Sequence, residues 1–260
     1  MNKSDHYIIS VCSGKNGTGK SIIAANLAYE LSRNNRNTVL CDTNFMSPTL
    51  HILFGIKPYY GFQDLIVNNH IIDKITCSIG KYLKLIACNT AQSHYTPDKD
   101  FVKSLEMIIT SIDSDCIIFD CNSGANNEVL ECCKISDIIL LVMTDEPSSV
   151  IDTYGLIKII RTHYPSLKIY LVINNVIDME DADDTANKLN QATALFLSSE
   201  YDSLGFIPYD RMVKSSIIQQ KLLNETTSTS LAAIAINTIA LAIDSFIQSN
   251  QTVESEVFLN

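Results

Sequence analysis

Hydrophobic residues in this chain gather in short continuous runs and do not alternate with polar residues. Such runs are typical of strands buried on both faces, as in a parallel sheet. Stretches that favour helices lie between them. The pattern predicts strands at residues 7–12, 38–42, 83–88, 116–120, 137–143 and 168–174. The predicted helices cover residues 20–34, 98–112, 126–134, 148–163, 181–199 and 230–247.

This alternation indicates an α/β fold, with a doubly wound, mostly parallel sheet and helices on both faces. The 260 residues suit a single domain, and we expect a short polar tail from about residue 249. The helix at 230–247 is expected to pack on the sheet. It looks too short, and too interrupted by Asn237, Thr238 and Asp244, to span a membrane.

Charge and cysteine usage limit the kinds of partner and the cellular compartment that we expect for the protein. The 29 acidic residues outnumber the 19 basic ones, which disfavours non-specific attraction to nucleic acid or anionic lipid. The eight cysteines have neither C-x-x-C pairs nor metal-site spacing, so we expect reduced thiols that pack like small hydrophobes. The N-terminal segment lacks the apolar core of a signal peptide. These features favour a soluble protein in a reducing cytoplasm.

The segment "SGKNGTGKS" at residues 13–21 carries the clearest chemistry. Gly14, Gly19, Lys20 and Ser21 satisfy G-x-x-x-x-G-K-[ST], with a predicted strand before and a predicted helix after. Glycines let backbone N–H groups point at phosphate oxygens, the lysine meets the β and γ phosphates, and the hydroxyl ligates magnesium. The segment therefore predicts binding of ATP or ADP with Mg²⁺.

Two aspartates end predicted strands, Asp42 in "VLCD" and Asp120 in "CIIFD". The carboxyl ends of parallel strands form the ligand crevice, so both residues are candidates to hold the metal or its water. The predicted metal site comprises Ser21, Asp42 and Asp120. Taken singly, each aspartate is equally consistent with a helix cap or the edge of a loop.

The loop "KNGTGKS" resembles the K-G-G-x-G-K-[ST] loop of the MinD/ParA group of ATPases, with Asn16 in place of the first glycine. In that family the early lysine reaches across an ATP-sandwiched dimer to the partner's phosphates. The resemblance implies this role for Lys15, and a homodimer on ATP binding. The alternative is a solvated lysine of a surface loop, which loop composition alone makes the less favoured of the two.

Within that group the chain is most similar to the flagellar-number regulators FlhG/FleN. The segments "VLCDTNFMSPTLHILFGI", "TDEPSSVIDTYGLIKII", "LVINNV" and "LGFIPYDRMVKSSIIQQKLL" follow the order and spacing of their motifs. The likeness implies that Asn174 and residues 208–210 face the adenine. The alternatives are a strand-end cap and a loop shaped by proline. Nucleotide contacts are thus expected from Gly14, Lys15, Asn16, Gly17, Thr18, Gly19, Lys20, Ser21, Ile22, Asn174, Pro208, Tyr209 and Asp210.

Asn44 is the main departure from the family pattern, in which the second aspartate of D-x-D orients the attacking water. An amide can hold a water but cannot accept its proton, and losing such a group typically costs a factor of about 10² to 10⁴. Thr49 and His51 likewise stand where Asn and Asp are expected. The resemblance implies slow ATP hydrolysis with catalytic roles for Lys15, Lys20, Asp42, Asn44 and Asp120.

Basic residues are scarce near the C-terminus. No Lys or Arg follows Lys221, which disfavours a basic amphipathic membrane anchor. Residues 201–260 contain three basic and six acidic side chains, which disfavours direct DNA binding. The resemblance implies protein partners, such as an FlhF-like GTPase or flagellar switch components, and recruitment to the cell pole or inner membrane through a partner.

Several functions remain open from the sequence. The first is an ATP-dependent dimerising switch with slow ATPase activity that regulates flagellar number, flagellar placement or polar localisation. The second is a nucleotide-binding scaffold deficient in hydrolysis, which the residue at position 44 favours. A MinD/ParA-type positioning ATPase for another cargo is a third. A kinase with a small-molecule acceptor is the least supported, because the four arginines form no lid-like cluster.

Overall fold

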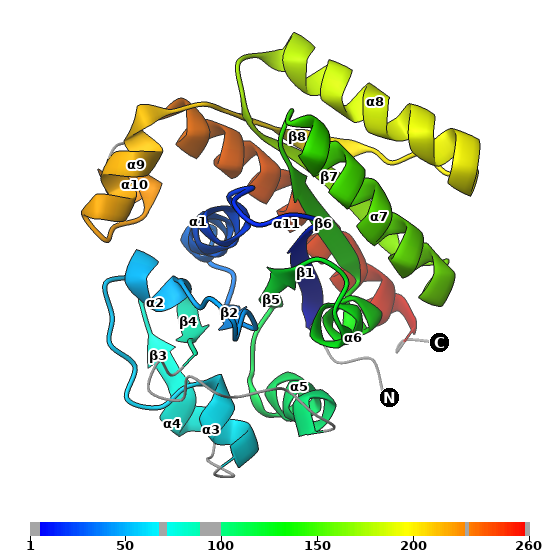
Figure 1. Cartoon of the computed structure of the whole chain (residues 1–260). Helices are drawn as coiled ribbons and strands as arrows, with labels where there is room; N and C mark the ends of the chain where they lie inside the picture. The colour runs from blue at the N-terminus through cyan, green and yellow to red at the C-terminus, as the bar shows by residue number, and fades with distance from the viewer. Residues whose placement is uncertain (1–5, 68–71, 89–99, 227–228, 258–260) are drawn as a thin grey trace.

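A computed structural model describes residues 6–67, 72–88, 100–226 and 229–257 (Figure 1). The strands in these residues are β1 (Tyr7–Ser13), β2 (Thr38–Asp42), β3 (Thr76–Ser78), β4 (Leu83–Ile86), β5 (Cys116–Ser123), β6 (Ile138–Met143), β7 (Lys168–Val176) and β8 (Ser203–Pro208). They form one sheet in the order β3-β4-β2-β5-β1-β6-β7-β8. Every neighbouring pair is parallel except β3 with β4. The predicted mostly parallel sheet is confirmed.

Helices cover both faces of the sheet. In the described residues they are α1 (Lys20–Arg33), α2 (Leu50–Leu53), α3 (Phe62–Val67), α4 (Ile72–Ile75), α5 (Asp100–Ser111), α6 (Asn127–Ile135), α7 (Pro147–His163), α8 (Met179–Leu197), α9 (Arg211–Ile218), α10 (Leu223–Thr226) and α11 (Leu231–Val257). One face packs against α1, α2, α10 and α11. The other packs against α3 to α8. This is the doubly wound arrangement that the sequence predicts.

Successive side chains of β1 enter opposite cores, because side chains alternate along a strand. Ile8 and Cys12 lie in the core beneath α6 and α7, whereas Ile9 and Val11 lie in the core beneath α1 and α11. All of these side chains are almost completely buried. A strand with two buried faces needs apolar residues at every position, which explains the continuous run in the sequence.

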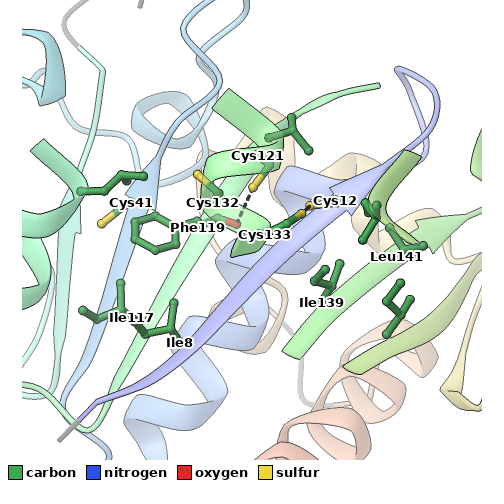
Figure 2. Close-up of a cluster of buried hydrophobic side chains, with 14 of the residues drawn as sticks. Ile8, Cys12, Cys41, Ile117, Phe119, Cys121, Cys132, Cys133, Ile139 and Leu141 are labelled. Atoms are coloured by element: carbon green, nitrogen blue, oxygen red, sulfur yellow. Dashed lines mark hydrogen bonds between the residues drawn. The ribbon is translucent and has the colours of Figure 1, made fainter. Parts of the chain in front are cut away.

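The eight cysteines are free thiols, and all but the half-buried Cys77 are buried. Figure 2 shows Cys12, Cys121, Cys132 and Cys133 among isoleucine, leucine and phenylalanine side chains. The Cys12 and Cys133 sulfurs are 3.7 Å apart, which is a contact between thiols. The expectation that these cysteines pack as small hydrophobes is confirmed.

Some elements differ from the prediction. Strands β3 and β8 and helices α2, α4, α9 and α10 were not expected. Strand β8 lies at the edge of the sheet and includes Gly205 and Pro208, so it lacks the continuous apolar run of a central strand. The predicted helix 98–112 corresponds to α5, but residues 98 and 99 lie outside the described residues.

The C-terminal helix corrects one expectation. Helix α11 continues to Val257, and its part from Leu231 to Asn250 is long and apolar enough to cross a membrane by length and composition. The argument from length and polar interruptions was wrong in this respect alone, because the helix extends beyond residue 247 and its Ile, Leu and Ala residues outweigh the polar interruptions. Its inner face packs on α1 and β8, through Ala232, Ala233, Ile236, Ile239, Ala240, Ile243 and Ile247. The expected packing on the sheet is confirmed.

Candidate functional site

Residues 14–19 form a loop between β1 and α1 at the carboxyl edge of the sheet. Gly17 and Gly19 have φ angles of 84° and 88°, in the left-handed region that favours glycine. Gly19 caps α1 without a side-chain hydrogen bond, and the first turn of α1 has no acidic residue. The first N–H groups of the helix and its positive dipole end are therefore available to an anion.

A cavity of about 670 Å³ opens beside this loop, a volume typical of small-molecule sites. Residues 16–22, which belong to the loop and the first turn of α1, line it, whereas Gly14 and Lys15 do not. The remaining lining residues are Ser13, Asn44, Ser47, Thr49, Ile52, Leu53, Ser123 and Ile217. The hydroxyls of two lining residues, Thr18 and Thr49, are buried without a hydrogen-bond partner in the described structure.

Asp42 and Asp120 meet because β2 and β5 are neighbours in the sheet. Their Cα atoms are directly paired in the parallel register, and both side chains are fully buried. Lys20 Nζ lies 3.3 Å from Asp120 Oδ1 and is itself 6% exposed. The carboxylate of Asp42 accepts hydrogen bonds from the backbone N–H groups of Asn44 and Leu50, at 3.1 and 3.3 Å.

Ionising both of these carboxyl groups would place more negative charge here than Lys20 can balance. Burial, followed by the charge of Asp120, raises the pKa of Asp42 to about 8. Burial likewise raises the pKa of Asp120, although Lys20 opposes the shift. Removing two carboxylates from water costs free energy that a nearby cation recovers.

The donors at this position fit a magnesium ion. Asp120 Oδ2 is buried without a hydrogen-bond partner in the described structure, as expected of an oxygen reserved for a cation. No group of three or more His, Cys, Asp or Glu side chains among the described residues is arranged to hold a metal. Magnesium commonly takes one or two carboxylates and completes its shell with phosphate and water oxygens. Ser21, Asp42 and Asp120 would hold it here.

Asn44 lies at the cavity wall in the loop after β2 and is 6% exposed. Its Oδ1 accepts a hydrogen bond from the Ser47 N–H at 3.2 Å, which fixes the side chain within its own loop. No Asp or Glu lines this cavity in the part of the chain that the structure describes. The residues at the wall can thus hold a water molecule but offer no carboxylate base.

Lys15 points away from the phosphate side of its own loop. Its Nζ forms an ion pair with Glu146 and donates to Ser148 Oγ at 2.7 Å. Both partners stand at the beginning of α7 and are exposed. The sequence did not identify either partner, because they lie more than 130 residues away in the chain.

A second cavity, of about 520 Å³, lies beside the first and shares Ile217 with it. The structure brings Asn174, Pro208, Tyr209 and Asp210, the residues expected to face the adenine, together in its wall. Sequence reasoning did not identify the other lining residues, Asn175, Arg211, Val213, Lys214, Ile217 and Ile218. Most of them belong to α9, which has no strong sequence signal.

Asp210 is engaged in holding the structure together. Its carboxylate accepts hydrogen bonds from Met212 N at 2.8 Å and Ser230 Oγ at 2.6 Å. Burial acts to raise the pKa of Asp210, but these hydrogen bonds outweigh it and lower the pKa. The residue caps α9 and ties it to the start of α11, so its carboxylate is largely committed within the protein.

The model of the CbiA family, the CobQ/CobB/MinD/ParA nucleotide binding domain, matches residues 9–223. The chain belongs to this family. It is 26% identical to the antiactivator FleN of Pseudomonas aeruginosa over 92% of the chain and 86% of that protein. It is also 26% identical to the flagellum site-determining protein YlxH of Helicobacter pylori, over 92% of the chain and 82% of that protein.

Solved structures show the same fold. The cell division ATPase MinD of Pyrococcus furiosus superposes with a TM-score of 0.77 at 18% identity, over 92% of this chain and 99% of that one. MinD of Pyrococcus horikoshii, solved as a complex with Mg-ADP, gives a TM-score of 0.77 at 18% identity, over 93% and 97%. The predicted resemblance to the MinD/ParA group and to FlhG/FleN is confirmed.

Proposed function

We propose that this protein is an ATP-dependent dimerising switch with slow ATP hydrolysis, which regulates the number or placement of flagella. ATP or ADP with magnesium would occupy the two adjacent cavities, the phosphates at the loop and the base beside Asn174. Family membership and the Mg-ADP complex of a structural relative support the choice of ligand. The similarity to FleN and YlxH supports the flagellar role.

The surroundings of Lys15 carry the dimer proposal. This lysine contributes nothing to the wall of its own cavity and instead lies at the surface with Glu146 and Ser148. Ile151, on the same helix as Ser148, is 68% exposed. A second copy that docks on this face would cover this side chain and place each Lys15 near the other copy's nucleotide.

Size-exclusion chromatography tests the dimer. Magnesium and a slowly hydrolysed ATP analogue should shift the protein from monomer to dimer, and Lys15→Ala should abolish the shift while nucleotide affinity changes less than about threefold. Lys158→Ala, which removes an exposed lysine of α7, is the matched control and should dimerise normally. A Lys15→Ala variant that dimerises like the wild type would refute the proposed role of this lysine.

The position of Asn44 supports slow hydrolysis. Lys20 and the N-terminus of α1 can stabilise the phosphate charge, but the amide at the cavity wall cannot take the proton of an attacking water. We expect Asn44→Asp to raise the rate of phosphate release by roughly 10²-fold. Lys158→Ala, at an exposed position of α7 outside the cavity, should leave the rate unchanged.

The same observation favours a second candidate, a nucleotide-binding scaffold without useful turnover. If wild type and Asn44→Asp both bind ATP and both release phosphate slowly, the missing carboxylate is not the limiting defect and the scaffold function is preferred. If both release phosphate at the same fast rate, the wild type is not slow and the slow-hydrolysis proposal fails.

The cellular setting follows from the same proposal. We place the protein in the cytoplasm and assign its recruitment to the cell pole or inner membrane to a protein partner. An FlhF-like GTPase or a flagellar switch component is the proposed partner class. A pull-down with the ATP-locked protein, compared with the same protein in ADP, should enrich such a partner only in the ATP state.

A further inference from the structure

We infer that Asn174 is a positioning residue for the phosphate-binding loop, in addition to any contact that it makes with the base. Its Nδ2 donates a hydrogen bond of 2.7 Å to the backbone carbonyl of Thr18, 156 residues away in the chain. Thr18 lies in the middle of the loop and is only 3% exposed. The inference rests on the proposed nucleotide function and adds a residue that sets the loop's geometry.

The loop and the amide fit closely. A Cβ atom at Gly19 would lie 2.3 Å from Asn174 Nδ2, so the glycine is needed partly to admit this side chain. The first backbone bond of α1 runs from Ile23 N to Gly19 O at 3.0 Å. The Thr18 carbonyl therefore lies one residue before the first carbonyl that accepts a backbone hydrogen bond within α1. The Asn174 side chain, which is not part of the helix, supplies its donor.

The end of β7 has the irregular backbone that directs this side chain. Its register with β8 shifts between Asn174 and Val176, and the intervening Asn175 has a φ of 63°. A bulge of this kind changes the direction of the neighbouring side chains, and Asn tolerates the left-handed conformation better than most residues. The bulge allows Asn174 to leave the regular strand geometry and reach the loop.

Asn174 thereby joins the two cavities. Its side chain lines the cavity of about 520 Å³, and the loop that it holds lines the cavity of about 670 Å³. A base in the first cavity and phosphates in the second would meet the same amide group. Loss of the amide should consequently weaken binding of a phosphate chain that carries no base at all.

The test uses inorganic tripolyphosphate with magnesium, and ATP with magnesium, each titrated into the full-length protein by calorimetry. Asn174→Asp keeps the shape of the side chain but removes the donor. We expect tripolyphosphate to bind about tenfold more weakly to this variant, the scale of one lost hydrogen bond. Ile177→Asp adds the same charge three residues away, at a position that is 83% exposed and outside the walls of both cavities, and should change affinity less than about twofold.

Four results would overturn the inference. Asn174→Asp that loses ATP but binds tripolyphosphate normally would show that the residue senses only the base. Equal losses in the two variants would show an effect of charge. A melting temperature without ligand that falls only in Asn174→Asp would show a general structural role. Wild-type protein that binds neither ligand would refute the nucleotide function itself, and the inference with it.

Discussion

Lys15 and Lys20 occupy opposite ends of one loop, yet the structure gives them opposite surroundings. Lys20 is 6% exposed and lies against Asp120, beside two fully buried carboxylates. Lys15 has a side chain that is 34% exposed and pairs with the more exposed Glu146. Lys20 therefore carries a buried charge that its own site needs. Lys15 carries a surface charge that is available to another molecule.

The difference has an energetic consequence. A charge in the interior is strongly felt by its neighbours, because little water screens it, and removing it leaves an opposite charge without compensation. A charge at the surface is screened, and its ion pair contributes little to stability. Substitutions at the inner end of the loop should thus change binding and folding, whereas those at the outer end should change association between copies.

Lys20→Ala should give the largest effect. The variant loses the cation that faces the phosphates and leaves Asp120 without its partner, so ATP affinity should fall by about a hundredfold or more. Calorimetry with Mg-ATP measures this, with Lys158→Ala as a control of unchanged affinity. If Lys15→Ala weakened ATP binding by as much as Lys20→Ala, the contrast between the two ends of the loop would be wrong.

Asp42 gives an effect of intermediate size that depends on pH. Its pKa is raised from 3.8 to about 8 in the folded protein, so between these values the folded chain retains a proton that the unfolded chain releases. The free energy of unfolding should therefore fall as the pH rises through this range, by at most about 1.4 kcal/mol per pH unit from this group. Above pH 8 its contribution should be constant.

Urea unfolding at pH 5 and pH 8, without nucleotide or metal, measures this effect. Asp42→Asn should lose less stability between the two pH values than the wild type, because the titrating group is absent. Glu146→Gln, which changes an exposed side chain, should show the same change in the free energy of unfolding with pH as the wild type. Parallel curves for wild type and Asp42→Asn would indicate that Asp42 does not bind the proton.

Glu146→Gln should give the smallest effect and should sharpen the interpretation of Lys15. The ion pair with Glu146 holds Lys15 within its own subunit, and it must open if Lys15 is to reach a second copy. The variant should dimerise at a roughly twofold to fivefold lower ATP concentration, as expected for an exposed ion pair. Asp145→Asn removes a neighbouring exposed charge and should leave the ATP dependence unchanged.

The sequence predicted most central elements because their signals are local. Strand β1 is apolar except for Ser10 and Ser13, and the loop after it matches a phosphate-binding motif within nine residues. Strand β8 escaped prediction because a partly exposed edge strand with Gly205 and Pro208 carries no such run. Helix α11 was expected to end at residue 247, because polar residues follow there. A helix that packs on one side only can continue through polar residues on its exposed side.

The sequence by itself determined the α/β class, the loop with its two lysines, and the two aspartates at strand ends. Each depends on residue types at fixed short spacing. Only the tertiary structure decided that Asp42 and Asp120 are paired, that Lys15 lies against Glu146, and that Asn174 holds the Thr18 carbonyl. These contacts join residues that are 78 to 156 positions apart in the chain, so they arise from the order of the strands in the sheet. A spacing rule along the chain contains no information on which strands become neighbours.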